Sequence, residues 1–125
     1  MNNSCFFHIR NMKSQLLYFL VFSFLAHFLV WLQLNLQFLN DKVKAHSWWL
    51  LLAGVPISWL WIKATQFGVA SFDGKFWPQR LVAFSIGIVL YTILTHYFFG
   101  EKFDAKSLTC IGLAFTIVGI QIFWK

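Results

Sequence analysis

Acidic residues are scarce in this chain, with only four Asp and Glu among 125 residues. Cysteine is scarcer still: Cys5 and Cys110 lack any CxxC or Cys/His spacing around them, so we expect neither a disulfide nor a metal site. The sequence also has no carboxylate pair, nucleophile motif or phosphate-binding loop. These absences argue against an enzyme and predict a protein that uses no cofactor.

Charge of both signs is low as well. Charged residues make up 11% of the chain, whereas a soluble domain usually carries about 25%. Hydrophobic residues make up 59%, including 16 Phe and 7 Trp, which predicts an integral membrane protein in contact with lipid. The net charge of +6 does not indicate nucleic-acid binding, because the Lys and Arg residues are scattered along the flanks of the apolar runs. Cationic side chains at such flanks meet anionic lipid surfaces.

Four apolar runs are long enough to cross a hydrocarbon core of about 30 Å, which takes about 20 helical residues. Two of them, Leu81 to Phe99 and Ser107 to Trp124, contain no charged residue and are joined by a short polar elbow. Inside lipid, backbone polar groups must pair within the chain, so each run is helical. We predict an all-α bundle of four transmembrane helices that forms one domain over residues 1–125. The helices are expected at about 15–39, 47–67, 78–99 and 106–124, after a polar lead at 1–14.

The polar lead followed by an apolar run is also the order found in a signal peptide. However, the run from Leu16 to Leu32 exceeds the 7–15 apolar residues of a signal peptide, and no Ala-x-Ala-like site follows. We therefore favour a retained first helix. A start at Met12 instead of Met1 is a second interpretation of the same stretch, and it would make the first eleven residues dispensable.

The first predicted helix carries a row of polar and aromatic residues on one face. Ser23, His27, Trp31 and Asn35 follow one another at intervals of four, so they stack along the helix. His27 lies near the middle of the run, where ionisable groups are costly and usually face a bundle interior or a cavity. It has two interpretations: a proton- or substrate-binding residue, or a neutral side chain that hydrogen-bonds to a neighbouring helix.

Two cationic residues of the second and third predicted helices are further candidates for a site. Lys63 is late in the second helix, where its long side chain either extends to the membrane interface or lines a cavity. Arg80 lies at the start of the third helix. Together with the polar row of the first helix, these residues are the candidates for a substrate or proton site.

Small residues recur along the fourth predicted helix. They are Thr109, Gly112, Thr116 and Gly119, spaced every three or four positions. Such a stripe lets two membrane helices approach closely, so we expect a homodimer that uses this face.

The distribution of Lys and Arg gives only a small bias in orientation. One side would hold Arg10, Lys13, Lys63, Lys75, Arg80 and Lys125, and the other Lys42, Lys44, Lys102 and Lys106. Because the positive-inside rule usually leaves a larger excess, six against four fits two topologies. Either both termini are cytoplasmic or the protein inserts in both orientations, as a multi-pass protein of an inner or plasma membrane.

The second half of the chain contains three features in order: Gly87–Leu90, the elbow Phe98–Asp104, and the spaced glycines Gly112 and Gly119. In these features, over about Leu81 to Ile122, the chain resembles the small multidrug resistance proteins, four-helix members of the drug/metabolite transporter superfamily. It implies a transporter-like four-helix fold. The family's drug antiporters use a glutamate in the middle of the first helix, whereas this chain has His27 there and no carboxylate in that helix.

A membrane site for a dehydrated cation needs a compensating negative charge, so the missing glutamate argues against export of cationic drugs. We expect a small transporter-like protein that moves a small neutral or anionic solute. His27 is the leading candidate for the residue that contacts the solute or carries the coupled proton. The alternative is an accessory membrane subunit without transport activity, whose polar face packs against a partner. The missing carboxylate favours the accessory subunit, and the polar row of the first helix favours the transporter.

Overall fold

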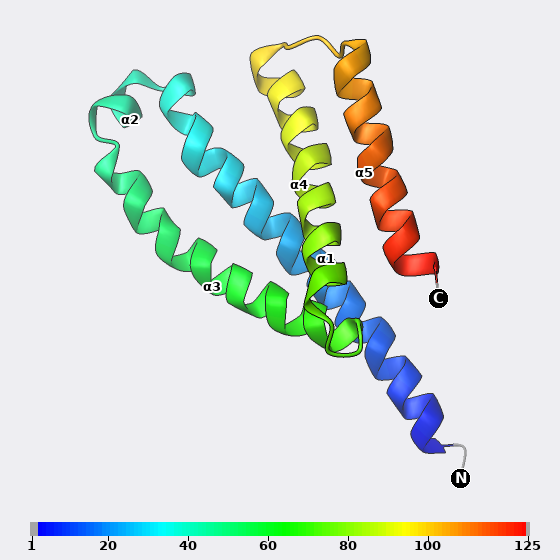
Figure 1. The fold of residues 1–125 in the computed structure, drawn as a ribbon. Helices are drawn as coiled ribbons and strands as arrows, with labels where there is room; N and C mark the ends of the chain where they lie inside the picture. The colour runs from blue at the N-terminus through cyan, green and yellow to red at the C-terminus, as the bar shows by residue number, and fades with distance from the viewer. Residues whose placement is uncertain (1–2, 125) are drawn as a thin grey trace.

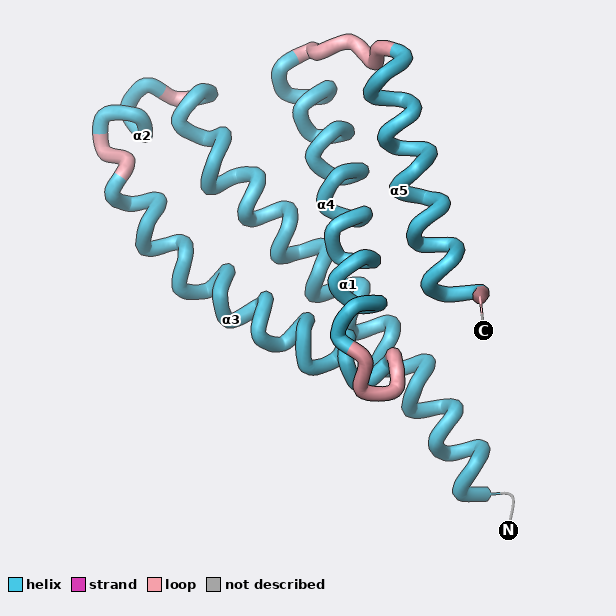
Figure 2. The backbone as a smooth tube through the Cα atoms, viewed as in Figure 1, coloured by secondary structure: helices cyan, strands magenta, loops and turns pink. Residues whose placement is uncertain are grey.

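The computed structural model describes the backbone of residues 3–124 and the side chains from Asn11 to Trp124. Over this range the chain forms five helices and no strand: α1 (Asn3–Leu39), α2 (Asp41–Ala45), α3 (Trp48–Ser71), α4 (Phe76–Phe99) and α5 (Ala105–Phe123). Figure 2 shows that only short loops join them. Segments of four helices, Asn11–Leu39 of α1 and all of α3, α4 and α5, are long and apolar enough to cross a membrane. The predicted all-α, four-helix membrane architecture is therefore present.

Two helix boundaries differ by more than two residues from those predicted, and one short helix was not predicted. The first helix begins at Asn3 instead of near residue 15, so the polar lead is helical from Asn3 onward; it contains no Pro or Gly to interrupt a helix. The hydrophilic connection after it contains the short helix α2, whose first turn is capped by the Asn40 side chain accepting from the Lys42 backbone N–H. The second predicted helix continues to Ser71, and the chain turns at Asp73 and Gly74, both with positive φ. Met1, Lys125 and the side chain of Cys5 lie outside the described residues.

The helices form two antiparallel hairpins that cross (Figure 1). In the first hairpin α1 packs on α3, and in the second α4 packs on α5, while α4 also packs on α1. The N-terminal part of α1 extends beyond the other helices, and α5 lies at the outer edge beside α4 (Figure 1). The centre of the molecule is therefore the place where α1, α3 and α4 meet.

The buried core lies at that meeting point. Phe19 of α1, Ala64 of α3, and Val82 and Ala83 of α4 are at most 2% exposed and form one cluster. Gly68 of α3 permits the close approach of the helices, since a Cβ atom there would lie 2.8 Å from the Phe19 ring and 2.9 Å from Cβ of Gln79. A larger residue at position 68 would separate three helices at once.

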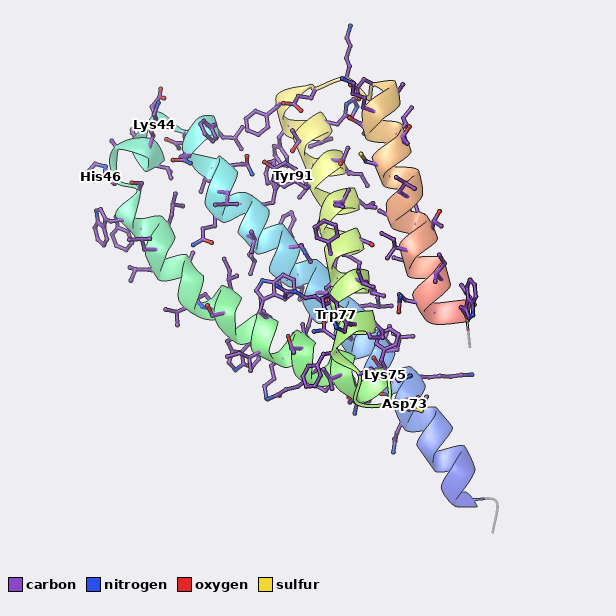
Figure 3. The ribbon with its side chains drawn as sticks, viewed as in Figure 1. Lys44, His46, Asp73, Lys75, Trp77 and Tyr91 are labelled. Atoms are coloured by element: carbon purple, nitrogen blue, oxygen red, sulfur yellow. The ribbon has the colours of Figure 1, made fainter. Side chains whose placement is uncertain are left out.

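Outside this core most large apolar side chains are exposed, as expected for a protein surrounded by lipid; Leu51 and Val55, for example, are 75% and 73% exposed. Charged residues gather in the connections instead. Figure 3 shows Lys44 at the end of the molecule formed by the α1–α3 connection, and Asp73 and Lys75 at the α3–α4 connection. This separation of an apolar middle from charged ends matches the layers of a bilayer.

Candidate functional site

A pocket of about 460 Å³ opens between α1, α3 and α4. We call it the His27 pocket and define it by its lining residues: His27 and Val30 of α1, Trp61 of α3, and Arg80, Ala83 and Phe84 of α4. Its floor adjoins the core cluster through Ala83. Two of the sequence-based candidates, His27 and Arg80, thus line the same pocket although they are far apart in sequence.

The imidazole of His27 is fixed on three sides. Its Nδ1 atom lies 2.8 Å from the carbonyl oxygen of Ser23. Because a carbonyl only accepts, Nδ1 is the donor, and Nε2 of the neutral ring keeps its lone pair. The ring meets Trp61 edge to face with centroids 4.7 Å apart. It also lies against the backbone of Gly87 on α4, where an added Cβ would be 2.5 Å from Nε2.

Arg80 supplies the positive charge of the pocket. It lies in the second turn of α4, next to the buried Gln79, and its side chain is exposed at the pocket wall. None of the four apolar segments contains Asp or Glu; the acidic residues Asp41, Asp73, Glu101 and Asp104 all lie outside them, in or beside the connections. The His27 pocket therefore combines a guanidinium with an imidazole, and the helices of spanning length that form its walls contain no carboxylate there.

The rest of the polar row on α1 belongs to a different structure, which we call the Trp31 cluster: Trp31, Asn35, Tyr91 and Thr95. The indole N–H of Trp31 donates to the Thr95 hydroxyl at 3.1 Å, and the amide of Asn35 donates to the Trp31 carbonyl at 2.9 Å. The Tyr91 hydroxyl lies 3.4 Å from Oδ1 of Asn35, and its side chain lies between α4 and α1 (Figure 3). Trp31 and Asn35 are buried, so this cluster joins the two helices by hydrogen bonds.

Ser23 contributes to the His27 pocket through its backbone carbonyl and not its hydroxyl. Its side chain is fully buried, and its Oγ atom has no hydrogen-bond partner among the described residues. Lys63 lies apart from the pocket: its ammonium group is 3.4 Å from Oε1 of Gln66 on the same helix. The structure therefore brings together two of the six candidate site residues, with Ser23 supporting one of them.

Most of the stripe on α5 lies open among the residues that the structure describes. Thr109, Gly112 and Thr116 are exposed, and a Cβ atom built on Gly112 or Gly119 would meet no atom within 4 Å. The hydroxyl groups of Thr109 and Thr116 donate to carbonyl groups of α5 itself. α5 instead contacts α4 through another face, which includes the buried Ala114. Among the described residues, Gly112 and Gly119 therefore leave room for a second protein chain to pack on this face of α5.

Sequence reasoning missed Trp61, Phe84 and Gly87 as neighbours of His27. The spacing of residues along one helix says nothing about which residues of other helices lie opposite. For Gly87 a signal existed, since a glycine inside an apolar helix usually marks a close approach. For Trp61 the sequence offered none, because Trp is common throughout this chain.

Among the residues that the structure describes, no group of three or more His, Cys, Asp or Glu side chains is placed to hold a metal ion. The class defined by the fold is that of a small multi-pass membrane protein with four helices of spanning length and a pocket between three of them that is lined by His27 and Arg80. Comparison with known proteins gives no match, whether to a protein-family model, a curated protein or a solved structure.

Proposed function

We propose that this protein is a small transporter of drug/metabolite-transporter type that moves a small neutral or anionic solute. The observation that supports it is the His27 pocket, in which residues from three helices of spanning length line a volume of about 460 Å³. An imidazole and a guanidinium there, without a carboxylate in any spanning segment, disfavour a cationic substrate. His27 contacts the solute or carries the coupled proton, because imidazole changes charge near neutral pH.

Flux measurements in liposomes test this proposal. The purified protein is reconstituted, and uptake of small solutes driven by a pH gradient is compared with that of His27→Ala and His27→Gln. Both variants should lose proton-coupled flux. His46→Gln is the matched control, since His46 lies in the connection between α1 and α3, away from the pocket. Full proton-coupled flux in both correctly folded His27 variants would rule out the role assigned to this residue.

A homodimer built on the α5 stripe belongs to the same proposal, because small residues spaced along a membrane helix let a second helix approach closely. The open positions Gly112 and Gly119 support it. In a bilayer two such stripes can approach closely and exchange van der Waals contacts. We further propose an inner or plasma membrane as the location, with both termini cytoplasmic or with both orientations present; reporter fusions at each terminus distinguish these topologies.

A second candidate function is that of an accessory subunit without transport activity. The Trp31 cluster favours it, because half of the polar row on α1 is already satisfied by α4 and serves packing. The α5 stripe would then meet a different protein. Affinity purification in mild detergent separates the two candidates: a stoichiometric heterologous partner supports the accessory subunit, and a dimer of this chain alone supports the transporter.

A further inference from the structure

We infer that the His27 pocket binds a small organic oxyanion with an apolar body, of the type of a monocarboxylate, through Arg80. This inference rests on the proposed function and narrows its substrate class from neutral or anionic solutes to one kind of anion. It follows from three properties of the pocket: its charge, the chemistry of its polar groups and the character of its remaining walls.

The charge of the pocket favours an anion over a neutral ligand. Arg80 carries a guanidinium, and the segment Phe76–Phe99 that contains it has no Asp or Glu. The Arg80 side chain is exposed on the protein, so in a bilayer it would lie beside lipid and the apolar pocket walls, where a charge is costly unless it is paired. A bound anion would supply the missing partner, whereas a neutral ligand would leave the guanidinium uncompensated and a cation would repel it.

The donors of the pocket suit an oxyanion in particular. A guanidinium presents its N–H groups as a planar fork that matches the two oxygens of a carboxylate. His27 adds a second polar group. Its Nδ1 already donates to the Ser23 carbonyl, so the remaining ring nitrogen is Nε2, which lies beside Gly87. When neutral, Nε2 accepts a hydrogen bond from a carboxylic acid; when protonated, it donates one to a carboxylate.

The remaining walls are apolar or aromatic. Val30, Ala83 and Phe84 present only hydrocarbon, and the Trp61 ring lies nearly perpendicular to the His27 ring. A small inorganic anion without an apolar part would leave these apolar walls in contact with water. A ligand with one anionic head and a small apolar body fills the pocket, which is the usual composition of a small-molecule site: mainly apolar with few oriented polar groups.

Three benzene derivatives of nearly equal size test the inference: benzoate, neutral benzamide and cationic benzylamine. Their binding to the full-length protein in nanodiscs of phosphatidylcholine is measured by isothermal titration calorimetry. We expect benzoate to bind at least about tenfold more tightly than benzamide, since hydrogen bonds to charged groups contribute more than neutral ones. We expect no binding of benzylamine. Equal affinities for benzoate and benzamide would overturn the inference.

Substitutions at Arg80 test whether this residue causes the preference for benzoate over benzamide. Arg80→Gln should reduce the affinity for benzoate to that for benzamide, and Arg80→Lys, which keeps the charge but not the fork, should lie between. Lys63→Gln removes a cation outside the pocket and should leave the preference unchanged. Circular dichroism and the elution volume in detergent verify folding, and Arg80→Lys carries the test if Arg80→Gln does not fold. Unchanged preference in both Arg80 variants would contradict the inference.

The same oxyanion chemistry occurs in lipid phosphates, so the titration is repeated in nanodiscs that contain phosphatidic acid. Unaltered benzoate binding supports a free solute, whereas competition that disappears in the Arg80 variants would assign the pocket to a lipid headgroup and overturn the free carboxylate.

Liposome flux separates this inference from the proposed function. If benzoate binds in an Arg80-dependent way but is not transported, the proposed transport function is refuted and the anion site is retained. If the liposomes take up benzamide but not benzoate, the transport function is retained and the anion preference is refuted.

Discussion

At the scale of single residues, the close approach of His27 and Gly87 determines where the imidazole lies. We predict that Gly87→Ala displaces the ring, because the new Cβ would lie 2.5 Å from Nε2 and 2.6 Å from Cδ2. The expected loss of stability is about 1–3 kcal/mol, as for other overpacked sites. Solute flux should fall by about tenfold or more, since small displacements of a functional group have large effects. Unfolding by SDS in micelles and liposome flux measure the two effects.

A double-mutant cycle provides the control for Gly87. In a His27→Ala background the ring is absent, so Gly87→Ala should cost little further stability. If Gly87→Ala destabilises the His27→Ala variant as much as it destabilises the original protein, then the imidazole is not the group that position 87 accommodates.

The Trp31 cluster gives a second prediction at this scale. Thr95→Val removes the acceptor of the Trp31 indole N–H, while Trp31 is 1% exposed and has no access to lipid headgroups or water. An unpaired buried donor should cost about 1 kcal/mol, which SDS unfolding can measure. Thr92→Val is the matched control on α4, because Thr92 donates only to the Ile88 carbonyl of its own helix. Equal effects of the two substitutions would show that the contact between helices contributes nothing.

These residues also show what the sequence could reveal about the site. The spacing of four placed His27, Trp31 and Asn35 on one face of α1, and their position at membrane depth marked them as polar groups that need partners. The spacing along α1 could not predict which residues of the other helices His27, Trp31 and Asn35 would contact. His27 meets Trp61 and Gly87, whereas Trp31 and Asn35 meet Thr95 and Tyr91, and only tertiary packing separates the two groups.

At the scale of helices, the ends of α4 and α5 are determined by local chemistry in the elbow between them. Gly100 adopts φ of +67° and ends α4, with its N–H donating to the His96 carbonyl at 2.9 Å. Asp104 caps α5 by accepting from the backbone N–H of Ser107 at 2.8 Å. Both signals are visible in the sequence, which is why these two boundaries were predicted within one residue. The start of α1 was not predicted in this way, because a polar helix that extends out of the bundle shows no hydrophobic pattern.

The cap of α5 should depend on pH. Hydrogen bonds from Ser107 to its carboxylate hold the pKa of Asp104 below the ordinary value of 3.8. The cap is therefore fully formed above that value and is lost as the pH falls through the lowered pKa of the folded state. We predict that amide exchange at Ser107, corrected for its intrinsic pH dependence, becomes faster only in that acidic range. Asp104→Asn keeps an accepting oxygen without a titrating group, so its exchange should not change there; a change like that of the original protein would refute the cap as the cause.

At the scale of the whole molecule, the sequence predicted the number and type of spanning helices because length and apolar composition alone decide them. The crossing of the two hairpins was not predictable in this way. It depends on Gly68, whose missing side chain admits Phe19 and Gln79, and on Ala64 and Ala83 in the same core. Such contacts join residues of three helices, and apolar periodicity contains no information about their pairing.

The unpartnered stripe of α5 leads to a prediction about assembly. Gly112→Leu and Gly119→Leu should leave the fold of one chain intact, since no atom lies within 4 Å of a Cβ at either position. In a dimer formed through this face the added side chains would hold two helices apart and should raise the dissociation constant at least about tenfold. Energy transfer between labelled chains in liposomes measures this constant.

The control for the assembly prediction changes an exposed position on a different helix. Val55→Leu on α3 alters a side chain that is 73% exposed and should leave the dissociation constant unchanged. A dimer that both glycine variants leave equally stable would place the interface elsewhere. A chain that is monomeric before any substitution would leave the α5 stripe to a different protein, as the accessory function requires. The association state of the unmodified chain therefore decides between the two candidate functions before any solute is tested.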